Sequence, residues 1–192
     1  MDFFATDTLI EPERGDLLIS EPYLPDPNFE RTVVYLCEHD ENGTFGFVLN
    51  NKAQVKLADV VDEVGNYKAD LFIGGPVQQD TLHFLHRHDQ LFSSARHVKN
   101  EIYWGGDYDK LLECINTKSI DSKDIRFFLG YSGWSPNQLM DELKQKSWIV
   151  LKGASQEMIF DWDNRDLWKA CLNTMGGKFR LISNYPKDPR LN

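Results

Sequence analysis

Short apolar runs separated by polar turns predict a protein rich in β-strands. Runs of β-branched and aromatic residues suit strands at 16–20, 32–38, 45–49, 70–73, 81–86, 102–104, 125–129, 148–151 and 158–160. The Asn42–Gly43 pair lies between the second and third runs, and such a pair supplies the backbone angles of a tight hairpin. A β-hairpin is therefore expected at about residues 32–49.

About four helices are expected between these strands. Apolar residues with i, i+3, i+4, i+7 spacing predict helices at about 56–64 and 108–115, and a further helix is expected at 166–175 with Gly176–Gly177 as its stop. Asp107 is placed to cap the second of these helices. Strands joined by hairpins, with helices at irregular intervals, indicate an α+β fold rather than a doubly wound parallel sheet.

The stretch Ile125–Leu151 contains the strongest local pattern in the chain. A buried strand is expected at Ile125–Leu129, followed by a turn bracketed by Gly130 and Gly133. Ser135, Pro136 and Gln138 fit the N-cap, first-turn and capping-box positions of a helix. On this helix, Leu139, Met140 and Leu143 are expected to form an inward apolar stripe. Asp141, Glu142 and Lys144 are expected to face water.

Composition and charge narrow the class of protein. The 192 residues are 41% apolar, which suffices for one domain with a sizeable core. A net charge of −9 opposes binding to nucleic-acid phosphates, so direct DNA binding is not expected. The sequence contains no membrane-spanning run and no signal peptide pattern, which favours the cytoplasm. Three separated cysteines, Cys37, Cys114 and Cys171, indicate reduced core thiols.

The sequence predicts a single domain spanning residues 1–192. Residues 1–14 are expected to form an N-terminal arm or short helix, residues 15–176 the core, and residues 177–192 a docked tail. Residues 21–31 contain three prolines, which fit neither the interior of a helix nor the hydrogen-bonded positions of a β-sheet. This segment is therefore expected to be a rigid loop.

Five separated segments resemble the AlgH/YqgE family of bacterial proteins. They read GDLLISEPYLPDPNFERTVVYLCEH, GTFGFVLN, FIGGPV, FFLGYSGWSPNQLMDEL and SWIVL, and together they span about Gly15–Gly176. The resemblance implies an α+β fold with a branched sheet that includes a small closed barrel, packed by helices. The family has no established biochemical activity, and its frequent label of transcriptional regulator is an inference about a pathway. The family usually has alanine where this chain has Ser132, which counts against a family nucleophile there.

Several motifs could carry chemistry, and each has a structural alternative. Ser132 lies between Gly130 and Gly133 but lacks the spacing of a nucleophile elbow. His83, His86 and His88 do not share one face of a strand, so we expect no metal site. No cofactor motif is present either, and we expect no cofactor.

Gly74-Gly75-Pro76 lacks the spacing of a phosphate-binding loop, and a tight strand exit is the favoured interpretation.

The expected binding site is an anion-binding cleft at the helix start after Gly130–Ser135. Unpaired N–H groups there carry partial positive charge, and the glycines allow a ligand to approach the backbone. Residues at nearby strand ends and in the proline loop complete the predicted set, which is Asp26, Asn28, Asn50, Gly74, Gly75, Pro76, Gly130, Gly133, Trp134 and Gln138. A capping box alone would also explain Gln138, and Trp134 also suits a core position.

Two function classes therefore remain open. The first is a protein, enzyme or not, that binds a small molecule, an anion or a nucleotide in this cleft. The alternative is a regulatory or protein-interaction module without catalytic activity, whose ligand would be a protein partner. DNA-binding regulation is a weaker third option, because the chain is acidic and has no recognisable basic helix-turn-helix.

Overall fold

The computed structural model describes residues 9–161 and 166–188, which build one large mixed sheet with helices packed around it. The strands are β1 (Leu17–Ser20), β2 (Val33–Asp40), β3 (Gly43–Val48), β4 (Lys52–Lys56), β5 (Asp70–Ile73), β6 (Val77–His86), β7 (Arg96–Lys99), β8 (Ile102–Trp104), β9 (Ile125–Trp134) and β10 (Trp148–Leu151). Neighbours follow the order β10-β1-β2-β3-β9-β6-β8-β7, and β4 with β5 forms a branch joined to β9. The expected α+β class and branched, mostly antiparallel sheet are confirmed.

The sheet branches at β9. The first half of this strand pairs in parallel with β5, where Leu71 lies opposite Phe127, and antiparallel with β6. The second half pairs with β3, where Gly46 lies opposite Ser132. The expected closed barrel is not present among the described residues, because the path of paired strands ends at β10 and β7 without joining.

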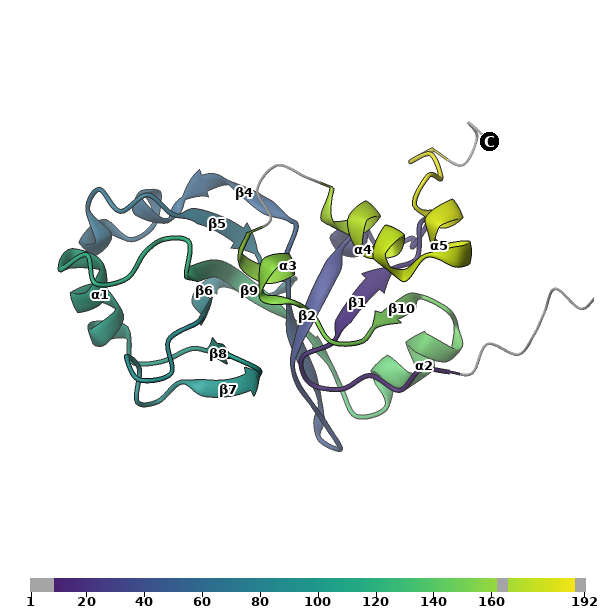
Figure 1. Cartoon of the computed structure of the whole chain (residues 1–192), viewed down its shortest axis with the longest axis horizontal. Helices are drawn as coiled ribbons and strands as arrows, with labels where there is room; N and C mark the ends of the chain where they lie inside the picture. The colour runs from purple at the N-terminus through teal and green to yellow at the C-terminus, as the bar shows by residue number, and fades with distance from the viewer. Residues whose placement is uncertain (1–8, 162–165, 189–192) are drawn as a thin grey trace, which may run out of the picture.

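Five α-helices occur in the described residues: α1 (Tyr108–Asn116), α2 (Gln138–Lys144), α3 (Gln156–Phe160), α4 (Leu167–Met175) and α5 (Gly177–Ile182). Figure 1 shows α1 at one end of the molecule, α2, α4 and α5 at the other, and α3 between them. Asp107 and Asp166 cap α1 and α4 by accepting from the backbone N–H groups of Lys110 and Lys169. None of the described helices is long and apolar enough to cross a membrane.

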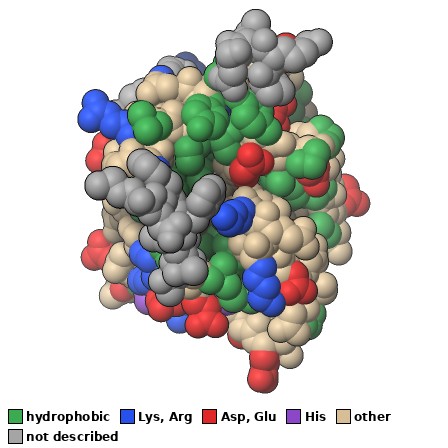
Figure 2. Space-filling view, turned by 90° about the vertical axis from the view of Figure 1, so that its right-hand side faces the viewer, with side chains coloured by type: hydrophobic (Ala, Val, Ile, Leu, Met, Phe, Trp, Pro, Cys, Tyr) green, Lys and Arg blue, Asp and Glu red, His purple; other side chains and the backbone are tan. Residues whose placement is uncertain are grey.

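The helices at the two ends cover separate parts of the core. Trp168 of α4 is fully buried in the largest cluster, and its Nε1 donates to the carbonyl of Ser20 in β1 at 2.9 Å. Leu111 and Ile115 of α1 pack in a second cluster. The end with α2 and α5 shows apolar side chains beside charged ones (Figure 2), and Leu181 of α5 is 70% exposed there.

The predicted hairpin forms between β2 and β3, with Asp40 paired to Gly43. Its two-residue loop is one position earlier than expected, since Glu41 and Asn42 connect the strands. Of the expected pair, Gly43 alone has a positive φ, of +138°. A Cβ on Gly43 would lie 2.6 Å from the carbonyl oxygen of Trp134, so close approach to β9 also requires glycine.

The predicted turn at Gly130–Gly133 is wrong, because β9 continues through it to Trp134. Gly130 has φ +66° inside the strand, and a Cβ there would lie 2.7 Å from the carbonyl oxygen of Val77. The register between β6 and β9 shifts at this point, between Val77 and Leu82. Glycine thus marks a bulge and a close backbone approach rather than the end of a strand.

Two other predicted elements differ from the structure. Residues 56–64 form two short 3-10 helices, Leu57–Asp59 and Asp62–Val64, rather than one α-helix. Three valines in this segment disfavour a helix, and Val60 is 47% exposed instead of facing inward. The predicted strand at 158–160 is part of α3, which Ser155 caps by accepting from the Met158 N–H. Three further elements, β4, β7 and α5, have no counterpart in the prediction.

Candidate functional site

A depression of about 370 Å³ lies where β9 passes into α2. Four separate segments line it: the proline loop, the residue before β6, the β9–α2 junction and the start of β10. The lining residues are Leu24, Asp26, Phe29, Pro76, Gly133, Trp134, Gln138, Glu142, Ser147 and Trp148. The structure therefore brings five of the predicted residues, Asp26, Pro76, Gly133, Trp134 and Gln138, to one place.

Three aromatic rings form the wall of this depression. Phe29 meets Trp148 edge to face with ring centroids 5.3 Å apart, and Trp134 meets Trp148 in the same manner at 5.8 Å. Phe29 also stacks against Trp134 at 6.3 Å. Both tryptophans are buried, so the wall is part of the core and is held in a fixed position.

The Glu142 carboxylate joins these rings to α2. Its Oε2 accepts from the indole Nε1 of Trp134 at 2.9 Å and of Trp148 at 2.7 Å. Its Oε1 accepts from Gln138 Nε2 at 3.0 Å. Glu142 was expected to face water, and this prediction is wrong because the side chain is half-buried against the two indoles.

Asp26 contributes a second carboxylate at the rim. It is the N-cap of a short 3-10 helix, Pro27–Phe29, and its Oδ1 accepts from the Asn28 backbone N–H at 2.9 Å. The side-chain amide of Asn28 donates to the same oxygen at 3.0 Å. The residues lining the depression thus include two carboxylates and, in the described part of the chain, no Lys, Arg or His.

The helix start differs from the predicted capping box. The N-cap of α2 is Asn137, with φ +67°, and neither Ser135 nor Pro136 holds the predicted position. Gln138 does reach back as expected, since its Oε1 accepts from the Ser135 backbone N–H at 3.0 Å and from the Ser135 Oγ at 3.1 Å. The Gln138 side chain thus satisfies the Ser135 N–H, as a capping-box partner does, and leaves one N–H donor fewer for an anion.

The other predicted residues have structural contacts outside the lining. Asn50 joins two loops, because its Oδ1 accepts from the Val33 N–H at 2.9 Å and its Nδ2 donates to the Arg31 carbonyl at 2.8 Å. Gly74 and Gly75 lie against β9, where a Cβ on Gly75 would be 2.2 Å from the Tyr131 carbonyl carbon. Asn28 contacts Asp26 but does not line the depression, and Gly130 lies within β9.

Ser132 and His86, two of the residues considered for chemistry, are held by backbone contacts. Ser132 is fully buried and its Oγ donates to the Gly74 carbonyl at 3.0 Å. His86 is also fully buried, with Nε2 2.8 Å from the Gly105 carbonyl, and burial lowers its pKa to about 4. Within residues 9–161 and 166–188, no three His, Cys, Asp or Glu side chains are grouped to hold a metal ion.

The predicted cleft included the proline loop with Leu24 and Phe29 but did not name these two residues, and it missed Glu142, Ser147 and Trp148. One signal could have found Glu142, because it lies four residues after Gln138 and so shares its face of α2. Phe29 and Trp148 come from the proline loop and β10, and only the tertiary fold brings them to Trp134.

Sequence relatives cover nearly the whole chain. The chain matches the AlgH-like family over residues 17–180. A UPF0301 protein of Cytophaga hutchinsonii is 45% identical over 180 residues, which are 93% of this chain and 98% of that protein. A UPF0301 protein of Chlorobium limicola is 39% identical over 178 residues, covering 93% of this chain and 95% of the relative.

Solved structures share the fold. The solution structure of AlgH from Pseudomonas aeruginosa matches with a TM-score of 0.71 at 28% identity, over 93% of this chain and 98% of that one. A crystal structure of a Corynebacterium diphtheriae protein matches with a TM-score of 0.75 at 22% identity, over 95% and 97% of the two chains. Since the family match extends from β1 into α5 and the relatives align over almost their full length, this chain belongs to the AlgH-like family.

Proposed function

We propose that the protein binds a small organic cation, an alkylammonium or guanidinium group, in the depression between Asp26 and the two tryptophans. The observation that carries this proposal is the combination of the Asp26 and Glu142 carboxylates with three aromatic rings in one depression. Carboxylates and aromatic ring faces both attract cations. A volume of about 370 Å³ also suits a small ligand, since such sites span about 300–1,000 Å³.

This proposal reverses the sign of the ligand expected from the helix start. The Ser135 N–H donor is already bonded to Gln138, and two negative charges line the same depression. An anion there would be repelled by both carboxylates. The Glu142 carboxylate accepts three hydrogen bonds and lines the depression, so its field favours a cation there.

Binding rather than catalysis is the activity proposed. The lining contains one hydroxyl, that of Ser147, and no histidine or cysteine to serve as its base or as a nucleophile. The same chemistry also fits the lysine or arginine side chain of a partner protein, which is the interaction alternative. The cation is thus the shared feature, and its source distinguishes a small-molecule binder from an interaction module.

Calorimetric titration tests this proposal with agmatine, which carries an amine and a guanidinium group. The neutral compound 1,4-butanediol and the anion succinate serve as ligand controls, and a capped peptide with one central lysine represents a partner protein. We expect saturable binding of agmatine and none of succinate. Binding of the peptide alone would support the interaction alternative, and binding of neither cation would refute the proposal.

The variant Asp26→Asn isolates the charge, because asparagine also serves well as an N-cap. We expect agmatine binding to weaken about fivefold, which corresponds to the ~1 kcal/mol of one partly exposed ion pair. Asp107→Asn is the matched control, since Asp107 caps α1 in the same way and does not line the depression. Equal affinities for the two variants would show that Asp26 does not contact the ligand.

A further inference from the structure

A second cavity, of about 780 Å³, lies beside β5 and the end of α3 and shares no lining residue with the depression at α2. Figure 1 shows β5 and α3 near each other, close to β9. Three segments line the cavity: residues 56–72, the turn before β9 and its first residues, from Ser122 to Arg126, and Phe160–Asp161. Its volume falls within the range of about 300–1,000 Å³ that is typical of ligand sites.

The floor of this cavity is apolar and firmly held. Phe72 and Phe160 line it and are only 8% and 9% exposed. Arg126 packs on Phe72 with its guanidinium carbon 3.9 Å from the ring centroid. The same guanidinium donates to the carbonyls of Ile159 and Leu49 and so joins α3 to the residue after β3. The aromatic surface is therefore kept in place by buried hydrogen bonds.

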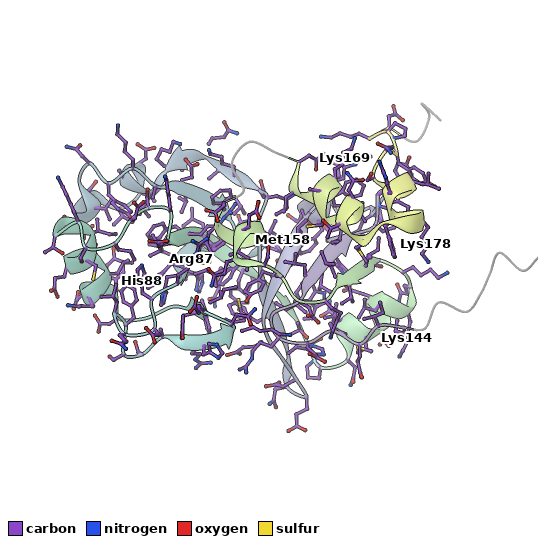
Figure 3. All side chains as sticks on the ribbon, viewed as in Figure 1. Arg87, His88, Lys144, Met158, Lys169 and Lys178 are labelled. Carbon is purple, nitrogen blue, oxygen red and sulfur yellow. The ribbon has the colours of Figure 1, made fainter. Side chains whose placement is uncertain are left out.

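Two of the three carboxylates that line the cavity are neutralised by cations. Lys52 and Lys56 both contact Asp70, and although burial alone would raise the pKa of Asp70, these hydrogen bonds lower it. Asp161 pairs with Arg87 at 2.9 Å, and Arg87 lies beside α3 (Figure 3). The charge that these two carboxylates could offer a ligand is thus already balanced.

Two lysines at the rim have no such partner. Lys68 and Lys123 line the cavity, are exposed, and have no carboxylate within 4.0 Å in the described part of the chain. Four cationic and three acidic side chains line this cavity, on a chain whose net charge is −9. Counted with Arg126 in the floor, the lining therefore carries a net formal charge of +1 on an acidic protein, and Lys68 and Lys123 supply its unpaired cations.

Tyr67 is a further lining residue, and it carries an unsatisfied hydrogen-bond donor, because its hydroxyl is buried without a hydrogen-bond partner among residues 9–161 and 166–188. Burial raises the pKa of this hydroxyl, so it keeps its proton at neutral pH. A buried donor without a partner is costly, and a ligand oxygen would satisfy it.

We propose that this cavity binds a small organic anion, a phosphate or carboxylate group attached to a flat apolar ring. Lys68 and Lys123 attract the anionic group, the Tyr67 hydroxyl donates to it, and Phe72 with Phe160 contacts the ring. This site is separate from the depression at α2 and has the opposite charge preference. It does not depend on cation binding at that depression, and the two can fail independently.

Titration of the full chain with 1-naphthyl phosphate tests this inference, with two-dimensional amide NMR as the readout. Inorganic phosphate and 1-naphthol supply the anionic group and the ring separately. We expect saturable shifts centred on residues 67–69 and 122–125 with 1-naphthyl phosphate, and affinity for each separate compound at least about tenfold weaker. Shifts centred elsewhere, or equal affinity for 1-naphthol, would overturn the proposal.

A charge-reversed variant tests the role of the lysines. Lys68→Glu/Lys123→Glu should weaken binding of 1-naphthyl phosphate by about tenfold or more, because it removes both unpaired cations. The control Lys144→Glu/Lys169→Glu changes the net charge equally on α2 and α4, outside the cavity (Figure 3). It should retain most of the affinity. Equal losses in the two double variants would show a net-charge effect and would contradict a site at Lys68 and Lys123.

Discussion

Replacing Glu142 by alanine should destabilise the protein far more than its position on a short surface helix suggests. The change removes the acceptor for the indole N–H groups of Trp134 and Trp148, both of which are buried. A hydrogen bond to a charged group contributes about 1.5–3 kcal/mol, and water entering the opened space would recover part of that for each indole. We therefore expect the free energy of unfolding to fall by about 2–4 kcal/mol.

Urea unfolding followed by far-ultraviolet circular dichroism measures this change. Asp141→Ala is the matched control, because Asp141 lies on the same helix with a 62% exposed side chain and an ion pair to Lys144. It should change the free energy of unfolding by less than about 1 kcal/mol. Glu142→Gln should lie between the two, since it keeps one carbonyl oxygen for the indoles. A Glu142→Ala variant as stable as Asp141→Ala would refute the claim that this carboxylate holds the aromatic wall.

Two further predictions concern the centre of the sheet. Burial lowers the pKa of His86 to about 4, so between pH 4 and 6.5 the unfolded chain binds more protons than the folded one. The free energy of unfolding should therefore rise with pH across this window, by up to about 3 kcal/mol, and His86→Gln should flatten the slope measured by urea unfolding at pH 5 and 7. Gly75→Ala should cost about 2 kcal/mol or more in the same assay, because the new Cβ would meet the Tyr131 backbone at 2.2 Å. Gly65→Ala, at φ +54° and ψ −121° with no atom within 4 Å of a new Cβ, should cost only the ~1–3 kcal/mol of that strained backbone conformation and less than Gly75→Ala, and equal losses would contradict the packing argument.

The sequence correctly predicted those elements for which the local pattern and the packing of the folded chain favour the same secondary structure. The Asp107 cap and the apolar face of α1 follow directly from spacing, because Leu111 and Ile115 are buried in the structure. The 56–64 segment has similar spacing but forms two 3-10 helices, which turn Leu57 and Val64 inward and leave Val60 exposed. Spacing alone could not distinguish these outcomes.

Glycine was the least reliable signal at the junction of β9 and α2. The sequence predicts the start of a turn at Gly130, whereas the approach of Val77 and Gly75 to β9 requires this glycine inside a strand. That requirement comes from a partner strand more than 50 positions earlier in the chain, so it leaves no local trace. The role of Asn50 was also not visible in the local sequence. Its side chain satisfies the backbone groups of Arg31 and Val33, which only the folded chain brings close to it.

The candidate site was predictable in part. Trp134 and Gln138 were expected at a helix start, and Asp26 and Pro76 at neighbouring loops, and all four line one depression. The charge of the site was not predictable, because Glu142 was expected in water and lies instead against two indoles. A single half-buried carboxylate thus changes the proposed ligand from an anion to a cation.

The indole N–H resonances of Trp134 and Trp148 provide the most direct test of cation binding at this depression. Both groups donate to Glu142, so a cation approaching that carboxylate should alter both signals. We expect the two resonances to shift saturably on titration with agmatine and to stay unchanged with succinate at the same ionic strength. Unchanged indole signals with agmatine, or equal shifts with both compounds, would contradict the proposed function.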